Sequence, residues 1–476
     1  MVFRRILAFV ALPIALLAAL CACMPGTNPP QTGTGDIGRP PALPREIEKE
    51  VGPAYQSPSL QTMVDRVGRR ILGRSGIAGN FRFYILDDPV ANAHAIGSEY
   101  IFVTRGLLAL IEDEAELAAA ISHELGHITR HHAAQREQER KGIMDSAMKA
   151  AVASGSISVG RSVAREGMVA LRRYSRDQEL EADRIGVEYL VRAGYRGDAM
   201  ATLIESLRRQ SRLEDRILGP AFDADDQQRN ALSTHPEPDD RLAALADFGD
   251  SRAPGASDRA DYLALIDGMS VDDAPEEGFV RGPAFLHPVM RIAFQAPPGF
   301  VLFNDHDGVL GVGRDRSVMY FSCTEERIRG RLDDWMRNEL KPTPADIQAT
   351  QIGGVEAAIG AKPRGAESGL AQVRYVIVRN GQGICYFNLL SDGPDRDRQI
   401  EALLAASRSF HFLSNAEASA LRPYRLHVVA RDGATAAALA RRMPYAEFKL
   451  ERLLVLNGVD DSAELAKRSE VKIVEP

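Results

Sequence analysis

The chain has 476 residues, enough for two or three domains that each have a core of their own. An apolar share of 45% and a charged share of 26% are those of a globular protein rather than a disordered one. The formal net charge of −7 argues against nucleic acid as a partner, because no strongly basic field is available to neutralise phosphates.

The first residues, MVFRRILAFVALPIALLAALCAC, have the order of a secretory signal. Arg4 and Arg5 precede an apolar run that is shorter than the roughly twenty residues of a membrane span. The run ends in LCAC, which resembles a bacterial lipobox. We therefore expect residues 1–23 to be a signal peptide and Cys23 to carry a lipid at the outer membrane, with simple secretion into the periplasm as the alternative. Residues 24–45, rich in Pro, Gly and Thr, are expected to form a flexible tether.

Helical and strand patterns follow the tether. SPSLQTMVDRVGRRIL predicts a core-facing helix that starts at Ser57 and Pro58, because apolar residues recur at helical spacing. These apolar residues are Leu60, Met63, Val64, Val67 and Ile71. FRFYIL and EYIFVT, which are rich in aromatic and β-branched residues, predict two strands after this helix.

The run EDEAELAAAISHELGHITRHHA contains the motif H-E-x-x-H. Asp113 marks a helix start, with Glu116 three residues on as in a capping box. Four residues make slightly more than one turn, so His123 and His127 share a face and can hold one ion. Glu124 lies about 100° round the helix, where it suits a base that acts on water. Zinc is the expected metal, one ion per chain, because two neutral imidazoles and a carboxylate leave a fourth position open.

A third ligand is needed, and YSRDQELEADRIGVEYL supplies three carboxylates further along the chain. Glu179 and Asp183 share a helix face, whereas Glu181 is turned about 200° away from Glu179. One carboxylate can bind the metal while its i+4 neighbour orients a ligand histidine. A solvated helix face is the alternative for an acidic cluster of this kind.

Three ordered segments carry a resemblance: NAHAIGSEYIFVTRGLLALIEDEAELAAAISHELGHITRHHA, then ELEAD, then STHPEPDDR. Together they resemble the zinc metallopeptidases that include the CAAX prenyl proteases, the HtpX-type membrane proteases and the periplasmic BepA-type proteases. The resemblance implies that His123 and His127 are metal ligands and that Glu179 is the third. It also implies that Glu124 is the general base and that Asp183 supports a ligand histidine.

The same resemblance implies where the substrate binds. In zinc peptidases of this kind an edge strand ahead of the H-E-x-x-H helix commonly receives the substrate backbone, so Asn92, Ala93 and His94 are expected to line the cleft. The family usually has an aromatic residue and a Pro-Gly-Gly turn where this chain has His94 and GSE at residues 97–99. That difference concerns substrate handling and affects no metal ligand.

His235, in STHPEP, has three readings. A His-Pro pair before a helix is commonly a structural corner. Related proteases have a His-Pro element near the metal, which implies either a latch on the fourth metal position or a donor to the oxyanion of the reaction. The nearby polar stretch DADDQQRN and two prolines favour the latch.

Residues 46–250 are expected to form the protease domain. Integral members of the family have a membrane segment near residues 142–172, but charged residues such as Lys149 and Arg161 interrupt that run here. Residues 251–277, rich in Asp, Gly and Pro, are expected to be a linker.

Residues 278–413 change to strand patterns such as VMYFSC and QVRYVIV, which predict an α+β accessory domain with an antiparallel sheet. No catalytic group of residues is recognisable in it. Cys323 and Cys385 lie in two of these strands, and either a disulfide or two buried thiols would fit an exported protein.

Residues 422–476 resemble a degenerate LysM module, with a strand, an Ala-rich helix, LNG and a final VKIV in that family's order. Such modules characteristically bind glycans of the peptidoglycan type. The Asp-Thr usual in these modules is replaced by Ala434 and Thr435 here.

These observations predict an α+β protein: a mainly α-helical gluzincin-like metalloprotease domain, an antiparallel-sheet domain and a small LysM-like βααβ module. The expected function is that of an exported zinc endopeptidase that cleaves unfolded or misassembled envelope proteins. A chaperone or assembly factor with a latent protease site is one alternative, and an envelope protein that binds peptidoglycan is another.

Overall fold

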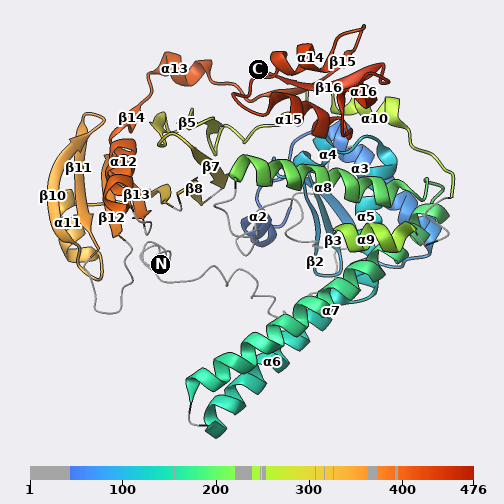
Figure 1. The fold of residues 1–476 in the computed structure, drawn as a ribbon, viewed down its shortest axis with the longest axis horizontal. Coiled ribbons are helices and arrows are strands. Elements are labelled where there is room, and N and C mark those ends of the chain that lie inside the picture. Colours follow the sequence, from blue (N-terminus) through green and yellow to red (C-terminus); the bar gives the residue numbers. More distant parts are fainter. Residues whose placement is uncertain are drawn as a thin grey trace. The chain divides into compact units, whose positions relative to one another are not determined.

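A computed structural model (Figure 1) gives the structure of the chain. It describes residues 43–154, 156–219, 238–246, 248, 253–305, 307–315, 317–324, 326–362, 372–391 and 395–476. The expected signal peptide, its Cys23 and most of the tether lie outside the described residues. The described chain divides into two compact units, one with residues 43–214, 238–272 and 424–476 and the other with residues 215–219 and 273–423.

The first unit begins with helices and a small sheet. The helices are α2 (Arg45–Val51) and α3 (Pro58–Ser75), and the strands are β1 (Arg82–Leu86), β2 (Ala93–Ile96) and β3 (Tyr100–Thr104). The predicted apolar face of α3 is confirmed, because the five residues named for it are all buried. The strand order is β1-β3-β2, with β1 parallel and β2 antiparallel to β3. β2 is therefore an edge strand, as expected, although its own residues gave no strand signal.

Six helices of the described chain follow this sheet. They are α4 (Arg105–Leu110), α5 (Glu114–Thr129), α6 (His132–Ser154), α7 (Ile157–Arg192), α8 (Ala199–Leu218) and α9 (Pro238–Ala246). α6 and α7 pack along each other as a hairpin, and α5 packs against α7 (Figure 1). None of the helices in the described part of the chain is long and apolar enough to cross a membrane.

The structure differs from the expected linker at residues 251–277. This segment contains a helix, α10 (Arg259–Ile266), whose Tyr262, Leu263 and Ile266 are buried in the same core as α3 and α5. The Tyr262 hydroxyl donates a hydrogen bond to the carbonyl of Leu108 at 2.5 Å. Composition predicted a linker because Asp, Gly and Pro surround a short apolar stretch that only tertiary packing makes helical.

The end of the chain packs into this first unit. It forms β15 (Arg425–Ala430), α14 (Ala436–Arg442), α15 (Lys449–Leu456), α16 (Ser462–Leu465) and β16 (Glu470–Glu475). β15 and β16 pair in antiparallel register around a small core. The expected order of a strand, helices and a strand is therefore present, while the LysM classification stays a prediction.

The second unit contains two sheets, whose neighbouring strands run antiparallel as predicted. One has the order β10-β11-β12-β13-β9-β8-β7, and the other β14-β6-β5-β4. The strands of the larger sheet are β7 (Phe300–Asp305), β8 (Gly308–Gly313), β9 (Val318–Thr324), β10 (Ala345–Ile352), β11 (Val355–Ala361), β12 (Gln372–Asn380) and β13 (Gly383–Ser391). Those of the smaller sheet are β4 (Phe279–Arg281), β5 (Ala284–His287), β6 (Ile292–Gln295) and β14 (His411–Phe412). The helices are α11 (Leu332–Glu339), α12 (Arg396–Arg408) and α13 (Asn415–Ala420).

The larger sheet is covered on both faces, which explains its nearly continuous apolar strands. Along β12, Val376 and Val378 join the core under α12, whereas Tyr375 and Ile377 join the core under α11. Cys385 of β13 lies opposite Cys323 of β9, and a disulfide joins them. Of the two alternatives for these cysteines, the structure has the disulfide.

Candidate metal centre

The H-E-x-x-H motif lies on α5, a helix buried along almost its whole length. Asp113 caps the helix, because its Oδ1 accepts a hydrogen bond from the N–H of Glu116 at 3.0 Å. The Glu116 carboxylate does not complete a capping box but accepts the N–H of Glu112 at 2.8 Å. His123 and His127 lie one turn apart as predicted, with their Nε2 atoms 3.0 Å from each other.

Two glycines let α7 approach α5 closely. A Cβ on Gly126 would lie 2.9 Å from the carbonyl oxygen of Ala182. A Cβ on Gly186 would lie 2.6 Å from the Met200 methyl and 3.3 Å from the backbone nitrogen of His123. Larger residues would push the two helices apart. This close crossing brings the carboxylates of α7 to the histidine face of α5.

Glu179 completes a group of three metal-binding side chains. Its two carboxylate oxygens lie 3.3 Å from the Nε2 atoms of His123 and His127, one at each. One ligand atom from each side chain lies within 4.8 Å of the others, and all three residues are buried. Burial lowers the pKa of His127 to about 4, which keeps the imidazole neutral, the form that binds a metal. Two imidazole nitrogens and one carboxylate fit zinc, and this donor set leaves a fourth position for a reactant.

A buried ion pair supports His123 from behind. Nδ1 of His123 is 2.8 Å from Oδ1 of Asp183, so the ring can direct Nε2 at the metal-binding group. Arg241 donates to both oxygens of Asp183 at 2.7 Å. Burial raises the pKa of Asp183, but Arg241 and His123 together outweigh this and lower the pKa to about 2, so the carboxylate stays an acceptor. Arg241 was not predicted, although its place at the end of the STHPEPDDR segment could have suggested it.

His127 has a different support, which sequence reasoning missed. Its Nδ1 lies 2.9 Å from Nδ1 of His132, the first residue of α6. Nε2 of His132 lies 3.3 Å from Oε2 of Glu181, and Nε of Arg130 lies 3.0 Å from the other Glu181 oxygen. Glu181 is therefore turned away from the metal-binding group, as predicted, yet it contacts that group through His132. The available signal was the His-His pair that follows the motif on the same chain segment.

The remaining predicted residues have different outcomes. Glu124 is buried on α5, close enough to His127 and Arg241 to influence their charges. Ala93 and His94 lie on β2, which packs against α5, and the His94 ring stacks on Phe102 with centroids 5.2 Å apart. Asn92 directly precedes β2, and its N–H donates to the Thr104 hydroxyl at 2.9 Å.

His235 lies outside the described residues. The substrate-binding role of residues 92–94, the base role of Glu124 and both functional readings of His235 therefore stay predictions.

Comparison with known proteins agrees with this geometry. Residues 56–248 match the model of Peptidase family M48. The beta-barrel assembly-enhancing protease of Escherichia coli strain K12 is 27% identical over 203 residues, which cover 40% of this chain and 39% of that protein. The mitochondrial metalloendopeptidase OMA1 of Schizosaccharomyces pombe is 29% identical over 171 residues, which cover 34% of this chain and 49% of OMA1. The metalloprotease LoiP of Escherichia coli strain K12 is 29% identical over 168 residues, or 34% of this chain and 63% of LoiP.

This chain spans less than two thirds of the length of each of these relatives. The crystal structure of LpqN, involved in cell envelope biogenesis of Mycobacterium tuberculosis, covers 26% of this chain at 15% identity, and its TM-score of 0.22 is too low to support an argument. The family match contains the two motif histidines, Glu179 and the two residues behind His123. Residues 56–248 are therefore similar to the metallopeptidases of family M48, and the buried His123, His127 and Glu179 form a group that fits zinc.

Proposed function

We propose that the whole chain is an exported zinc-dependent endopeptidase that cleaves unfolded or misassembled proteins of the bacterial envelope. The observation that carries this proposal is the buried convergence of His123, His127 and Glu179, with Glu124 beside them on the same helix. The relatives named for β-barrel assembly and the secretory character of residues 1–23 support the envelope as the location.

The chain's own residues divide the chemistry among them. Zinc, when bound, would polarise the peptide carbonyl and lower the pKa of water. Glu124 accepts the proton of the attacking water and passes it to the leaving amine, so that a C–O bond forms as the C–N bond breaks. Asp183, held by Arg241, fixes the His123 ring throughout. Burial of these groups strengthens each electrostatic interaction relative to water.

Peptide binding is assigned to the strand β2. A peptide that adds to an edge strand is held mainly through its backbone, which suits unfolded substrates of varied sequence. β2 lies at the edge of its sheet and packs against the α5 helix that carries the motif. Residues Asn92, Ala93 and His94 would then line the cleft, while Cys23 carries the lipid that holds the protein at the outer membrane.

Two alternatives remain distinct from this proposal. A chaperone or assembly factor would keep the zinc site but cleave little, and an envelope-binding protein would act through residues 422–476 on peptidoglycan. The buried zinc triad fits the endopeptidase and the assembly factor alike, so cleavage of protein is the property that separates these two.

The test compares the wild-type chain with Glu124→Gln. We expect the variant to keep zinc and its fold but to lose nearly all hydrolysis of an unfolded protein, because an amide cannot accept the proton of water. Zinc content is measured by atomic absorption and cleavage by gel electrophoresis on the same samples. Glu139→Gln, an exposed residue of α6, is the matched control and should cleave like the wild type.

The outcomes separate the alternatives. Cleavage by Glu124→Gln within a few-fold of the wild type would refute the base role. A wild-type chain that holds zinc and prevents aggregation without cleaving would favour the assembly factor. Retention of the zinc-loaded chain on isolated cell wall without cleavage of protein would favour the peptidoglycan-binding alternative.

A further inference from the structure

We propose that His132 is a positioning residue for the metal ligand His127, within a hydrogen-bonded chain that runs from the zinc triad to Glu181. The proposal rests on the zinc site and not on the proposed cleavage of envelope proteins. Its two contacts join α5 to the start of α6, and the start of α6 to the C-terminal half of α7. Figure 1 shows these three helices beside one another.

The first contact fixes which atom of His127 carries a proton. Nε2 of His127 faces Nε2 of His123 and an oxygen of Glu179, so it is the atom that binds the metal. A metal-bound nitrogen has no proton, and a neutral imidazole carries its one proton on the other nitrogen. Nδ1 of His127 therefore carries the proton and donates a hydrogen bond to Nδ1 of His132, 2.9 Å away.

The second contact fixes the tautomer of His132 in turn. Because Nδ1 of His132 accepts a hydrogen bond, the proton of this neutral ring is on Nε2. That nitrogen lies 3.3 Å from Oε2 of Glu181, and a carboxylate accepts there. Arg130 donates to the other oxygen of Glu181 at 3.0 Å and helps to hold it. Each donor therefore meets an acceptor along His127, His132 and Glu181. In the opposite tautomer of His132, its Nδ1–H would face the Nδ1–H of His127 and no hydrogen bond could form between them.

The surroundings of His132 favour a fixed ring. Its relative exposure is 1%, and it meets the His127 ring edge-on with centroids 5.0 Å apart at 74°. His131, at φ 56°, turns the chain between α5 and α6 and so delivers His132 to this position. The two ligand histidines consequently differ: a buried carboxylate orients His123, and a neutral imidazole orients His127. Removing the imidazole would free the His127 ring to rotate and weaken zinc binding.

The test measures zinc affinity in the full chain without substrate, by competition with a chromogenic chelator. We expect His132→Leu to weaken zinc binding about 10- to 100-fold, the usual effect of losing a partner behind a metal ligand. His132→Asn places an amide oxygen near the position of Nδ1 and should recover part of that loss. Glu181→Ala should weaken binding less than His132→Leu, because it removes only the half-exposed end of the chain of hydrogen bonds.

His131→Asn is the matched control, because it is the exposed neighbour and asparagine tolerates a positive φ. Unchanged zinc affinity in His132→Leu, or equal losses in His132→Leu and His132→Asn, would overturn the proposal. A second measurement needs no variant: nitrogen NMR of the zinc-loaded wild type should find the proton of His132 on Nε2, and a proton on Nδ1 would overturn it. Because neither readout involves cleavage, a chain that binds zinc but cleaves nothing would refute the proposed function and leave this inference standing.

Discussion

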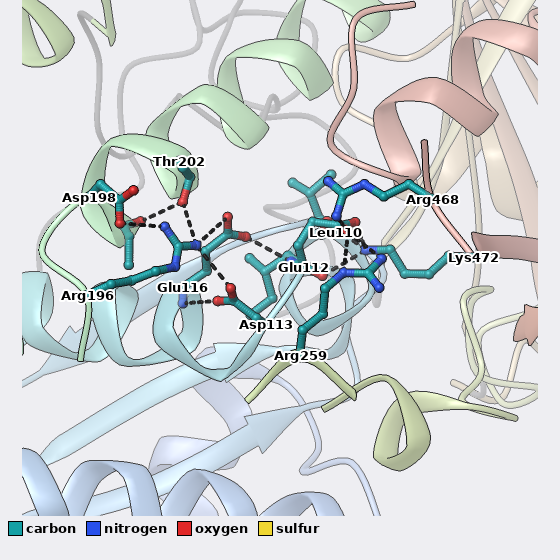
Figure 2. Close-up of polar contacts among 12 residues, drawn as sticks. Leu110, Glu112, Asp113, Glu116, Arg196, Asp198, Thr202, Arg259, Arg468 and Lys472 are labelled. Carbon is teal, nitrogen blue, oxygen red and sulfur yellow. Dashed lines mark hydrogen bonds and ion pairs between the residues drawn. The ribbon is translucent and has the colours of Figure 1, made fainter. Parts of the chain in front are cut away.

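Glu116 should give the metal-site unit a measurable dependence of stability on pH. It lies on α5 two turns before His123, where it is 2% exposed. Burial, and then the nearby charge of Asp113, raise the pKa of Glu116 from 4.5 to about 7. Arg196 forms an ion pair with Glu116 at 3.6 Å (Figure 2), but this contact does not offset the desolvation.

The sign and size of the effect follow from proton linkage. Between pH 4.5 and about 7 the folded chain keeps the proton of Glu116 while the unfolded chain has lost it. The folded state therefore binds more protons, and its stability falls as pH rises through this window. The contribution is fully present below pH 4.5 and is lost above about pH 7. One pKa unit corresponds to about 1.36 kcal/mol, so a difference of about 2.5 units changes the free energy of unfolding by about 3 kcal/mol.

Glu116→Gln removes the ionisation and keeps an oxygen for the N–H of Glu112. We compare the free energies of unfolding of the variant and the wild type at each pH. From pH 4.5 to pH 8 their difference should shift by up to about 3 kcal/mol in favour of the variant. Urea unfolding is followed by the helical circular dichroism signal, because the single tryptophan, Trp335, lies in the other unit. Glu139→Gln is the exposed control. Parallel stability curves for Glu116→Gln and the wild type from pH 4.5 to pH 8 would refute the reasoning.

Three further predictions concern the metal site and the end of the chain. Glu179→Ala should lower zinc occupancy sharply, because it removes a ligand. Equal zinc contents in Glu179→Ala and the wild type would contradict the ligand assignment. Asp183→Asn should lower zinc affinity about 10- to 100-fold. Lys472→Met should destabilise the first unit by about 3–5 kcal/mol in urea unfolding, because it leaves Glu112 buried without its closest cation. Lys467→Met is the exposed control, and equal stability of the two variants would contradict the role of Lys472.

Local periodicity predicted which side chains share a helix face, and the resemblance to zinc metallopeptidases then assigned Glu179 as the third ligand. The helical rise alone places His123 above His127, and the i+4 spacing of Glu179 and Asp183 gives one carboxylate to the metal and one to a ring nitrogen. These relations need only that α5 and α7 are helices that face each other. Their close crossing depends on Gly126 and Gly186, which a single sequence does not distinguish from any other helical glycine.

Residues that act through a second side chain were not predictable in this way. In the sequence Arg241 is one more charged residue beside acidic ones. Its role depends on the buried ion pair with Asp183, which the sequence does not show. His132 reads as an extra histidine, and its role depends on the turn at His131. α10 was missed for a related reason, because its burial against α3 and α5 comes from long-range packing rather than from a long amphipathic pattern. In each case the determining contact joins segments far apart in the sequence.

Lys472 connects the end of the chain with α4 and, through Glu112, with the helix α5. Its Nζ donates to the carbonyls of Ala109, Leu110 and Ile111 at 2.7 to 3.0 Å, which are acceptors that the end of α4 leaves without helical partners (Figure 2). It also lies 2.9 Å from Oε1 of Glu112.

Glu112 in turn contacts α5, because its N–H donates a hydrogen bond to the carboxylate of Glu116 in the first turn of that helix. Burial disfavours the charged form of Glu112, but Lys472 and Arg259 outweigh it and lower the pKa of the carboxyl. A fully buried lysine is costly unless its charge is matched in this way. Residues 424–476 therefore complete the polar surroundings of the helix that carries His123 and His127, whatever else they bind.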